Sequence, residues 1–192
     1  MRPFNAIISC FTLISFIIPA SSLAKNSPNN LTTTLPKISS FTAKRIPKTC
    51  VQTIESTKNK IAAIEAIPHE KRSFTNTVEA ASHALADYEL TINTIYLIKS
   101  VSPNKQVRDA GQKCIVKADQ FASVDLFTRE KLYQAFKEYD NKKPKLNYSQ
   151  NKLLKDYLIA FRKNGLMLPT NERQEVIKLK KELIKKTSAY RK

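Results

Sequence analysis

Apolar residues recur at helical spacing in this chain from about residue 49 to its end, while glycine is nearly absent. Only two glycines occur in 192 residues, although β-sheet proteins commonly need glycine in the tight turns between short strands. Apolar residues three and four positions apart share one face of an α-helix, which is buried against a neighbour. The pattern therefore predicts an all-α fold, an antiparallel multi-helix array with short connections.

Prolines and capping residues divide this region into about five or six predicted helices. The first is expected over residues 49–67 and ends before Pro68, because proline cannot continue a helix. Ser73, Thr75 and Asn76 are candidate caps for the second helix, since their side chains can accept hydrogen bonds from free backbone N–H groups.

The later helices are expected to begin at polar caps. Ser102 is predicted to cap the third helix with Pro103 at its first position, and Thr128 and Ser149 are predicted to cap the next two. Gly165 is expected in the left-handed conformation that closes the fifth helix. The predicted inward faces contain Val51, Ile54, Ile61 and Ile64; Val78, Ala81, Leu85, Tyr88, Ile92 and Ile95; Val107, Ala110, Cys114, Ala118 and Phe121; Leu132, Phe136 and Tyr139; and Leu153, Leu154, Tyr157, Leu158 and Phe161.

The last predicted helix carries a broad apolar stripe that needs a packing surface. Either the preceding helices supply that surface, or a surface outside this chain does. The helix has neither a closing glycine nor a proline stop at the end of the sequence. The stripe comprises Val176, Ile177, Leu179, Leu183, Ile184 and Tyr190, with Lys178, Lys181 and Lys185 opposite it.

The first 24 residues resemble a secretory signal peptide. A basic Arg2 precedes an apolar run over residues 6–18, and small residues lead to a predicted cleavage site after Ala24. The run is too short and too interrupted for a membrane anchor, and Cys10 lies inside it rather than at its end, which argues against a lipoprotein. We therefore expect export to the periplasm or outside the cell, with no stable membrane span after cleavage and with residues 25–48 as a disordered lead or linker.

The chain is strongly basic, with 33 lysines and arginines against 16 acidic residues. Cleavage after residue 24 would remove one arginine and leave a net charge of +16. Such a surface attracts nucleic acid, lipid head groups or acidic peptides without selecting one of them. Because the lysines are spread through every helix, we expect a solvated basic surface and no specific nucleic-acid site.

Two cysteines, Cys50 and Cys114, lie outside the predicted signal peptide. An exported protein could join them in a disulfide, but two buried thiols are equally compatible with the sequence. The chain has no paired CxxC spacing, and only His69 and His83 are available as further ligands. A metal site at these cysteines is therefore not predicted.

The sequence contains no self-contained active site. "HEKRS" at His69 has Ser73 where the metallopeptidase motif HExxH requires its second histidine. A GxSxG nucleophile motif is absent, and the two glycines, at Gly111 and Gly165, cannot form a phosphate-binding loop. No catalytic, cofactor-binding or metal-binding residue is predicted in this chain.

Four stretches nevertheless resemble, in the same order, the amino-terminal helical part of the thimet oligopeptidase family, which includes neurolysin and oligopeptidase A. They are "FTNT" (74–77), "VSPNKQVRDA" (101–110), "REKLYQAF" (129–136) and "RKNGLMLP" (162–169). The resemblance covers most of residues 49–192. It implies a nearly all-helical fold in which two lobes enclose a channel that admits short peptides.

In that family, zinc is bound by HExxH and a further glutamate in a carboxy-terminal catalytic part, to which no residue here corresponds. The resemblance therefore implies that residues 49–192 are a truncated, amino-terminal channel-wall segment of a zinc oligopeptidase. Such a segment is expected to be inactive alone and to hold no zinc of its own. An alternative is an exported helical protein that binds peptides or other proteins and that could be the partner of a separately encoded catalytic half. A basic protein acting on anionic envelope or nucleic-acid surfaces ranks last.

Overall fold

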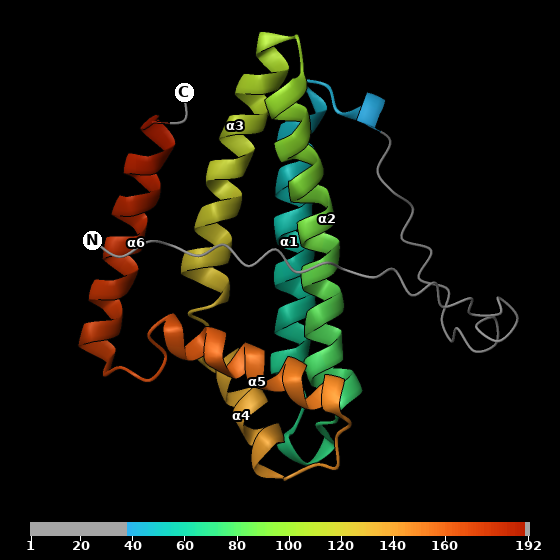
Figure 1. Cartoon of the computed structure of the whole chain (residues 1–192), viewed down its shortest axis with the longest axis vertical. Helices are drawn as coiled ribbons and strands as arrows, with labels where there is room; N and C mark the ends of the chain where they lie inside the picture. Colours follow the sequence, from blue (N-terminus) through green and yellow to red (C-terminus); the bar gives the residue numbers. More distant parts are fainter. Residues whose placement is uncertain (1–37, 191–192) are drawn as a thin grey trace, which may run out of the picture. The chain divides into compact units, whose positions relative to one another are not determined.

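The computed structural model describes residues 38–190 of the chain, with side chains up to Ser188. The predicted signal peptide and the predicted lead up to residue 37 lie outside this part. The described residues contain helices but no strands (Figure 1), which confirms the all-α prediction. The elements are η1 (Ile38–Ser40), α1 (Arg45–Glu65), η2 (His69–Lys71), η3 (Phe74–Glu79), α2 (Ala80–Val101), α3 (Lys105–Gln120), η4 (Phe121–Leu126), α4 (Glu130–Asn141), α5 (Tyr148–Lys163) and α6 (Thr170–Tyr190).

Helices α1, α2 and α3 pack side by side, each antiparallel to the next along the chain, and supply the centre of the hydrophobic core (Figure 1). Helices α4 and α5 lie across one end of these three, and α6 lies beside α3. No helix in the described part of the chain is long and apolar enough to cross a membrane. The core formed by α1, η3, α2 and α3 contains Ile46, Ile54, Ile61, Ile64, Val78, Ala81, Ala84, Tyr88, Ile92, Ile95, Ile98, Ile115 and Ala118.

The first helix begins earlier than the sequence predicted, so residues 38–48 are not a disordered lead. It starts at Arg45, whose backbone N–H donates to the Thr42 hydroxyl over 3.2 Å. Pro47 lies in the first helical turn, where the N–H that proline lacks would have no partner inside the helix. Phe41, just before the helix, joins the hydrophobic core. This segment therefore belongs to the fold.

The inward face of α1 runs along the helix from Ile46, its second residue. Ile46, Cys50, Ile54 and Ile61 are buried at intervals of one or two helical turns. Val51 was predicted on the same face, but it is 47% exposed because it lies about 100° around the helix from Cys50. The inward residues predicted for the later helices are buried or partly buried in the core.

Asparagines, and not the predicted serines, cap two of the helices. The side-chain oxygen of Asn104 accepts a backbone N–H bond of 2.8 Å from the first turn of α3, and that of Asn147 accepts one of 2.9 Å from the first turn of α5. Ser102 and Ser149 are therefore not caps. Serine and asparagine cap helices about equally well, so the sequence alone could not separate two candidates two residues apart.

One other predicted cap is confirmed and one is wrong. Ser73 caps η3 in a reciprocal pair of hydrogen bonds with Asn76, as capping boxes do. The Thr128 hydroxyl instead donates to the backbone carbonyl of Val124. It therefore bonds backwards into η4 and does not cap α4.

The two glycines hold distinct structural positions. Gly165 has a φ of +93°, and the N–H of the buried Leu166 donates to the Phe161 carbonyl over 3.2 Å, which confirms the predicted closure of α5. Gly111 lies in α3 against α2, where a Cβ atom would lie 2.7 Å from the Cβ of Lys99. Glycine there allows α2 and α3 to approach closely.

Helix α6 divides its apolar stripe between two environments. One side faces α3 and η4, and its apolar residues are half-buried. Leu179 and Leu183 lie off this side and are 54% and 61% exposed. The preceding helices therefore cover only part of the stripe, and the Tyr190 side chain lies outside the described part of the chain. The half-buried apolar residues are Val176, Ile177 and Ile184.

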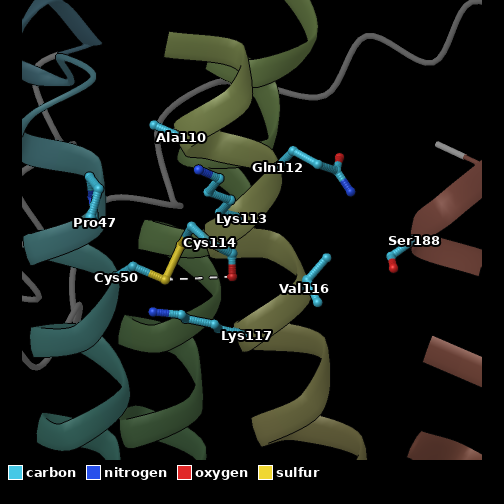
Figure 2. A pocket seen from close by; sticks show the side chains of 9 residues that line it. All are labelled: Pro47, Cys50, Ala110, Gln112, Lys113, Cys114, Val116, Lys117 and Ser188. Atoms are coloured by element: carbon cyan, nitrogen blue, oxygen red, sulfur yellow. Dashed lines mark hydrogen bonds between the residues drawn. A yellow bond between two sulfur atoms is a disulfide. The ribbon is translucent and has the colours of Figure 1, made fainter. Parts of the chain in front are cut away.

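A disulfide joins Cys50 of α1 to Cys114 of α3 (Figure 2), which resolves the two alternatives that the sequence left open. The Cα atoms are 5.8 Å apart, a separation typical of disulfides. Both cysteines are buried. The Cys50 Sγ atom also lies 3.5 Å from the Cys114 carbonyl oxygen; this is a contact and not a hydrogen bond, because a disulfide sulfur carries no proton.

A buried tyrosine, Tyr88, links α2 to α3 one helical turn beyond Cys114. The Tyr88 hydroxyl donates to the Ala118 carbonyl over 2.8 Å, and its ring meets the edge of Phe121 at 5.4 Å between centroids. Burial raises the pKa of Tyr88, and the nearby Asp119 and Glu89 carboxylates raise it further. The folded state therefore favours the neutral phenol.

We expect the fold to lose stability above about pH 10 because of Tyr88. A raised pKa contributes stability below the unfolded value, about 10 for tyrosine, and this contribution disappears as the pH rises through the folded-state pKa. Urea unfolding from roughly pH 8 to 11.5 measures it. Tyr88→Phe should lose about 1 kcal/mol at the lower pH and show a shallower alkaline decline.

Tyr148→Phe is the control, because the Tyr148 side chain is 83% exposed. It should leave the pH profile unchanged. Equal alkaline declines in the native chain and in Tyr88→Phe would contradict the assignment.

Candidate functional site

The segment that contains "HEKRS" follows α1 in the chain and is hydrogen-bonded to both the end of α1 and α4. The Arg72 side chain is buried; its Nε atom donates to Glu138 Oε2 over 3.1 Å and its Nη1 atom to the Ile64 carbonyl over 3.3 Å. His69 Nδ1 lies 3.4 Å from the same Glu138 oxygen. Lys142 Nζ donates to the His69 carbonyl over 2.6 Å. These contacts hold the loop and leave its residues in structural roles.

A bidentate ion pair crosses the same junction. Arg129 Nε and Nη2 donate to the two carboxylate oxygens of Glu65 over 2.7 Å and 2.6 Å. The Glu65 side chain is 8% exposed and that of Arg129 is 30% exposed. The bond to Glu65 raises the pKa of Arg129. Paired N–H donors of arginine match a carboxylate well, so this contact fixes the start of α4 against the end of α1.

The described residues do not fit zinc, the metal that the family resemblance implies. Zinc needs three or four nitrogen, sulfur or carboxylate ligands around one point, and no group of three such side chains occurs in the described part. Cys50 and Cys114 are bonded to each other. His69 lies in η2 and His83 is exposed on α2. We therefore derive no hydrolytic step from these residues.

A pocket of about 370 Å³ lies between α4 and α5; we call it the α4–α5 pocket. Lys137 comes to it from α4, and Lys155 and Arg162 come from α5. Asp140 is the single acidic residue in its lining. Within the described part of the chain these three cations form no ion pair. The pocket therefore has an excess of positive charge.

The same pocket has an apolar wall held by aromatic packing. Tyr133 lines it and packs against Phe161 with ring centroids 5.8 Å apart, while Phe136 packs on Phe161 at 5.5 Å. Ile159 adds an aliphatic side chain that is 39% exposed. An apolar wall beside unpaired cations suits a ligand that carries both an apolar group and a carboxylate.

Sequence reasoning missed the α4–α5 pocket. Lys155 and Arg162 are two helical turns apart on α5, so they share a face, which the sequence does indicate. Lys137 belongs to a different helix, and its approach depends on how α4 crosses α5. The sequence therefore indicates that Lys155 and Arg162 share a face, but only the packing of α4 against α5 brings Lys137 to the same pocket.

Comparison with protein-family models finds no match for this chain. The chain is 29% identical over 140 residues to a protein described as a thimet-like oligopeptidase, from Dictyostelium discoideum. The aligned residues cover 70% of this chain and 20% of that protein. The chain is similar to one part of an oligopeptidase. It spans about a fifth of that relative's length.

We expect the Glu65–Arg129 pair to contribute measurably to stability. Glu65→Gln removes the charge while keeping the size of the side chain, and it should lower the free energy of unfolding by about 1.5–3 kcal/mol, the usual range for hydrogen bonds to charged groups. Urea unfolding measures the change.

Glu55→Gln is the matched control, because Glu55 pairs with Lys58 on the surface of α1 and its side chain is 56% exposed. Exposed pairs contribute little, so this variant should change stability by less than about 0.5 kcal/mol. Equal losses in the two variants would contradict the structural role given to Glu65.

Proposed function

We propose that this chain is the amino-terminal channel-wall segment of an oligopeptidase-related protein and that it contacts short peptides. The similarity to the thimet-like oligopeptidase over 140 residues carries this proposal. The all-helical architecture agrees with it. Membership of the zinc oligopeptidase family is part of the same proposal.

The α4–α5 pocket is the peptide contact that we propose within the chain. Lys137, Lys155 and Arg162 attract a free terminal carboxylate or an acidic side chain, and Arg162 can form two parallel hydrogen bonds to it. Tyr133 and Ile159 offer an apolar surface to a neighbouring peptide side chain. A short peptide with an apolar residue at its carboxyl end combines both features.

Hydrolysis is assigned in this proposal to a zinc-containing catalytic part, either attached to this segment or encoded separately. The donors in the described part do not fit zinc, so the segment contributes binding and orientation only. Isolated, it should bind peptides without cleaving them.

Export is a further element of the proposal. The buried disulfide between Cys50 and Cys114 favours it, because disulfides persist in oxidising compartments and are rare in the reducing cytosol. The sequence pattern of the first 24 residues points the same way.

The alternative function is that of an exported helical peptide-binding protein that works without a catalytic partner. It is favoured by the fact that the α4–α5 pocket is formed entirely within this chain. The two functions agree on peptide binding and differ on whether a zinc-containing part completes the protein.

Calorimetric titration of the purified chain with N-acetyl-Leu-Leu-Phe tests the proposed contact. The free acid should bind about tenfold more tightly than its carboxyl-terminal amide, because the amide lacks the charge that Lys155 and Arg162 attract. Lys155→Gln combined with Arg162→Gln should remove this preference.

Lys131→Gln combined with Lys145→Gln removes the same charge from exposed positions outside the pocket, and it should preserve the preference. Equal binding of acid and amide by the native chain would contradict the pocket assignment. Cleavage of the peptide by the pure chain that a zinc chelator abolishes would contradict the division of roles.

A further inference from the structure

A second pocket, of about 450 Å³, lies on α3 between α1 and α6 (Figure 2); we call it the α3 groove. Small-molecule sites in proteins measure about 300–1,000 Å³, so its size suits a ligand and exceeds that of a few waters. Pro47 and Cys50 line it from α1, and Ser188 lines it from α6. It does not involve α4 or α5, so the inference below does not rest on the proposed function.

The lining of the α3 groove includes apolar residues. The disulfide of Cys50 and Cys114 lies in it beside Pro47, and Ala110 and Val116 add aliphatic surface from α3 (Figure 2). The Ser188 hydroxyl donates to the Lys185 carbonyl of its own helix over 2.8 Å. An apolar chain that displaces water from this lining gains free energy in proportion to the area it covers.

The α3 groove also carries positive charge. Lys113 and Lys117 are one helical turn apart on α3 and both line the groove. Neither belongs to an ion pair within the described residues. Among the described residues that line the groove none is acidic, and Asp109, one helical turn before Lys113, is bonded to Lys105 over 2.7 Å. The groove therefore attracts an anionic group.

The α3 groove also contains a buried hydrogen-bond acceptor. The Oε1 atom of Gln112, which also lines the groove, is buried and has no hydrogen-bond partner among the described residues. A buried polar atom without a partner is costly, so a ligand N–H that reaches it would recover a hydrogen bond. In Figure 2 the Gln112 side chain extends from α3 toward the side on which Ser188 lies.

We propose that the α3 groove binds an amphiphilic acid that has an apolar chain, an amide N–H and a carboxylate, as in an N-acyl amino acid. The apolar chain lies on the disulfide and Val116, the amide N–H donates to Gln112 Oε1, and the carboxylate accepts hydrogen bonds from Lys113 and Lys117. A second copy of the chain is disfavoured as occupant, because each copy carries a net charge of +17.

Isothermal titration of the purified, oxidised chain with N-decanoylglycine, below the concentration at which it forms micelles, tests the proposal. Three ligand controls each lack one feature: the methyl ester lacks the charge, decanoate lacks the amide N–H, and N-acetylglycine lacks the apolar chain. Each control should bind about tenfold more weakly or not at all.

Protein variants assign the contacts. Lys113→Gln combined with Lys117→Gln should weaken binding of N-decanoylglycine about tenfold and make acid and ester bind equally. Gln112→Ala should abolish the preference for N-decanoylglycine over decanoate. Ser188→Trp, which fills the groove from α6 and keeps every charge, should block binding.

Lys131→Gln combined with Lys145→Gln is again the charge-matched control, and it should bind N-decanoylglycine like the native chain. The proposal is overturned if the native chain does not bind N-decanoylglycine. It is also overturned if the control variant is weakened as much as the groove variant, or if Ser188→Trp binds normally. The last two results would mean that the ligand adheres to the basic surface in general.

Discussion

The packing of α1 against α3, joined covalently by Cys50 and Cys114, is the constraint on which the rest of the structure depends. Helix α2 completes this group of three and contributes Tyr88, whose hydroxyl bonds to the α3 backbone. The disulfide closes a long loop, since the two cysteines are 64 residues apart in sequence. Cross-links of that kind stabilise a fold mainly by restricting the unfolded chain.

Both candidate binding regions follow from this arrangement. The α3 groove exists because α1 and α6 flank the same helix, with the disulfide in the wall between α1 and α3. The α4–α5 pocket lies on the layer that crosses the end of the three helices, where Arg72 and the Glu65–Arg129 pair fix α4. Each region places cations beside apolar side chains, so a ligand that combines a carboxylate with an apolar group suits both.

Much of the fold could be predicted from the sequence, because helical spacing and glycine closure are local signals. The end of α1 before Pro68 and the closure at Gly165 are confirmed on that basis. The caps at Ser102 and Ser149 were wrong because neighbouring asparagines satisfy the same backbone groups. Neither pocket could be predicted, since each combines residues from helices whose crossing depends on the whole core. The functional proposal rests on similarity to part of a thimet-like oligopeptidase, and the peptide contact in it is our assignment of the α4–α5 pocket.

The most direct test of this account compares the free energy of unfolding of the oxidised chain with that of Cys50→Ala/Cys114→Ala. Free thiols in the native chain are counted by mass spectrometry after alkylation in denaturant without reductant, so that buried thiols also react. The account predicts that neither Cys50 nor Cys114 is alkylated and that the double variant is about 2–4 kcal/mol less stable. Alkylation of both cysteines under these conditions, together with equal stability of the two proteins, would contradict it.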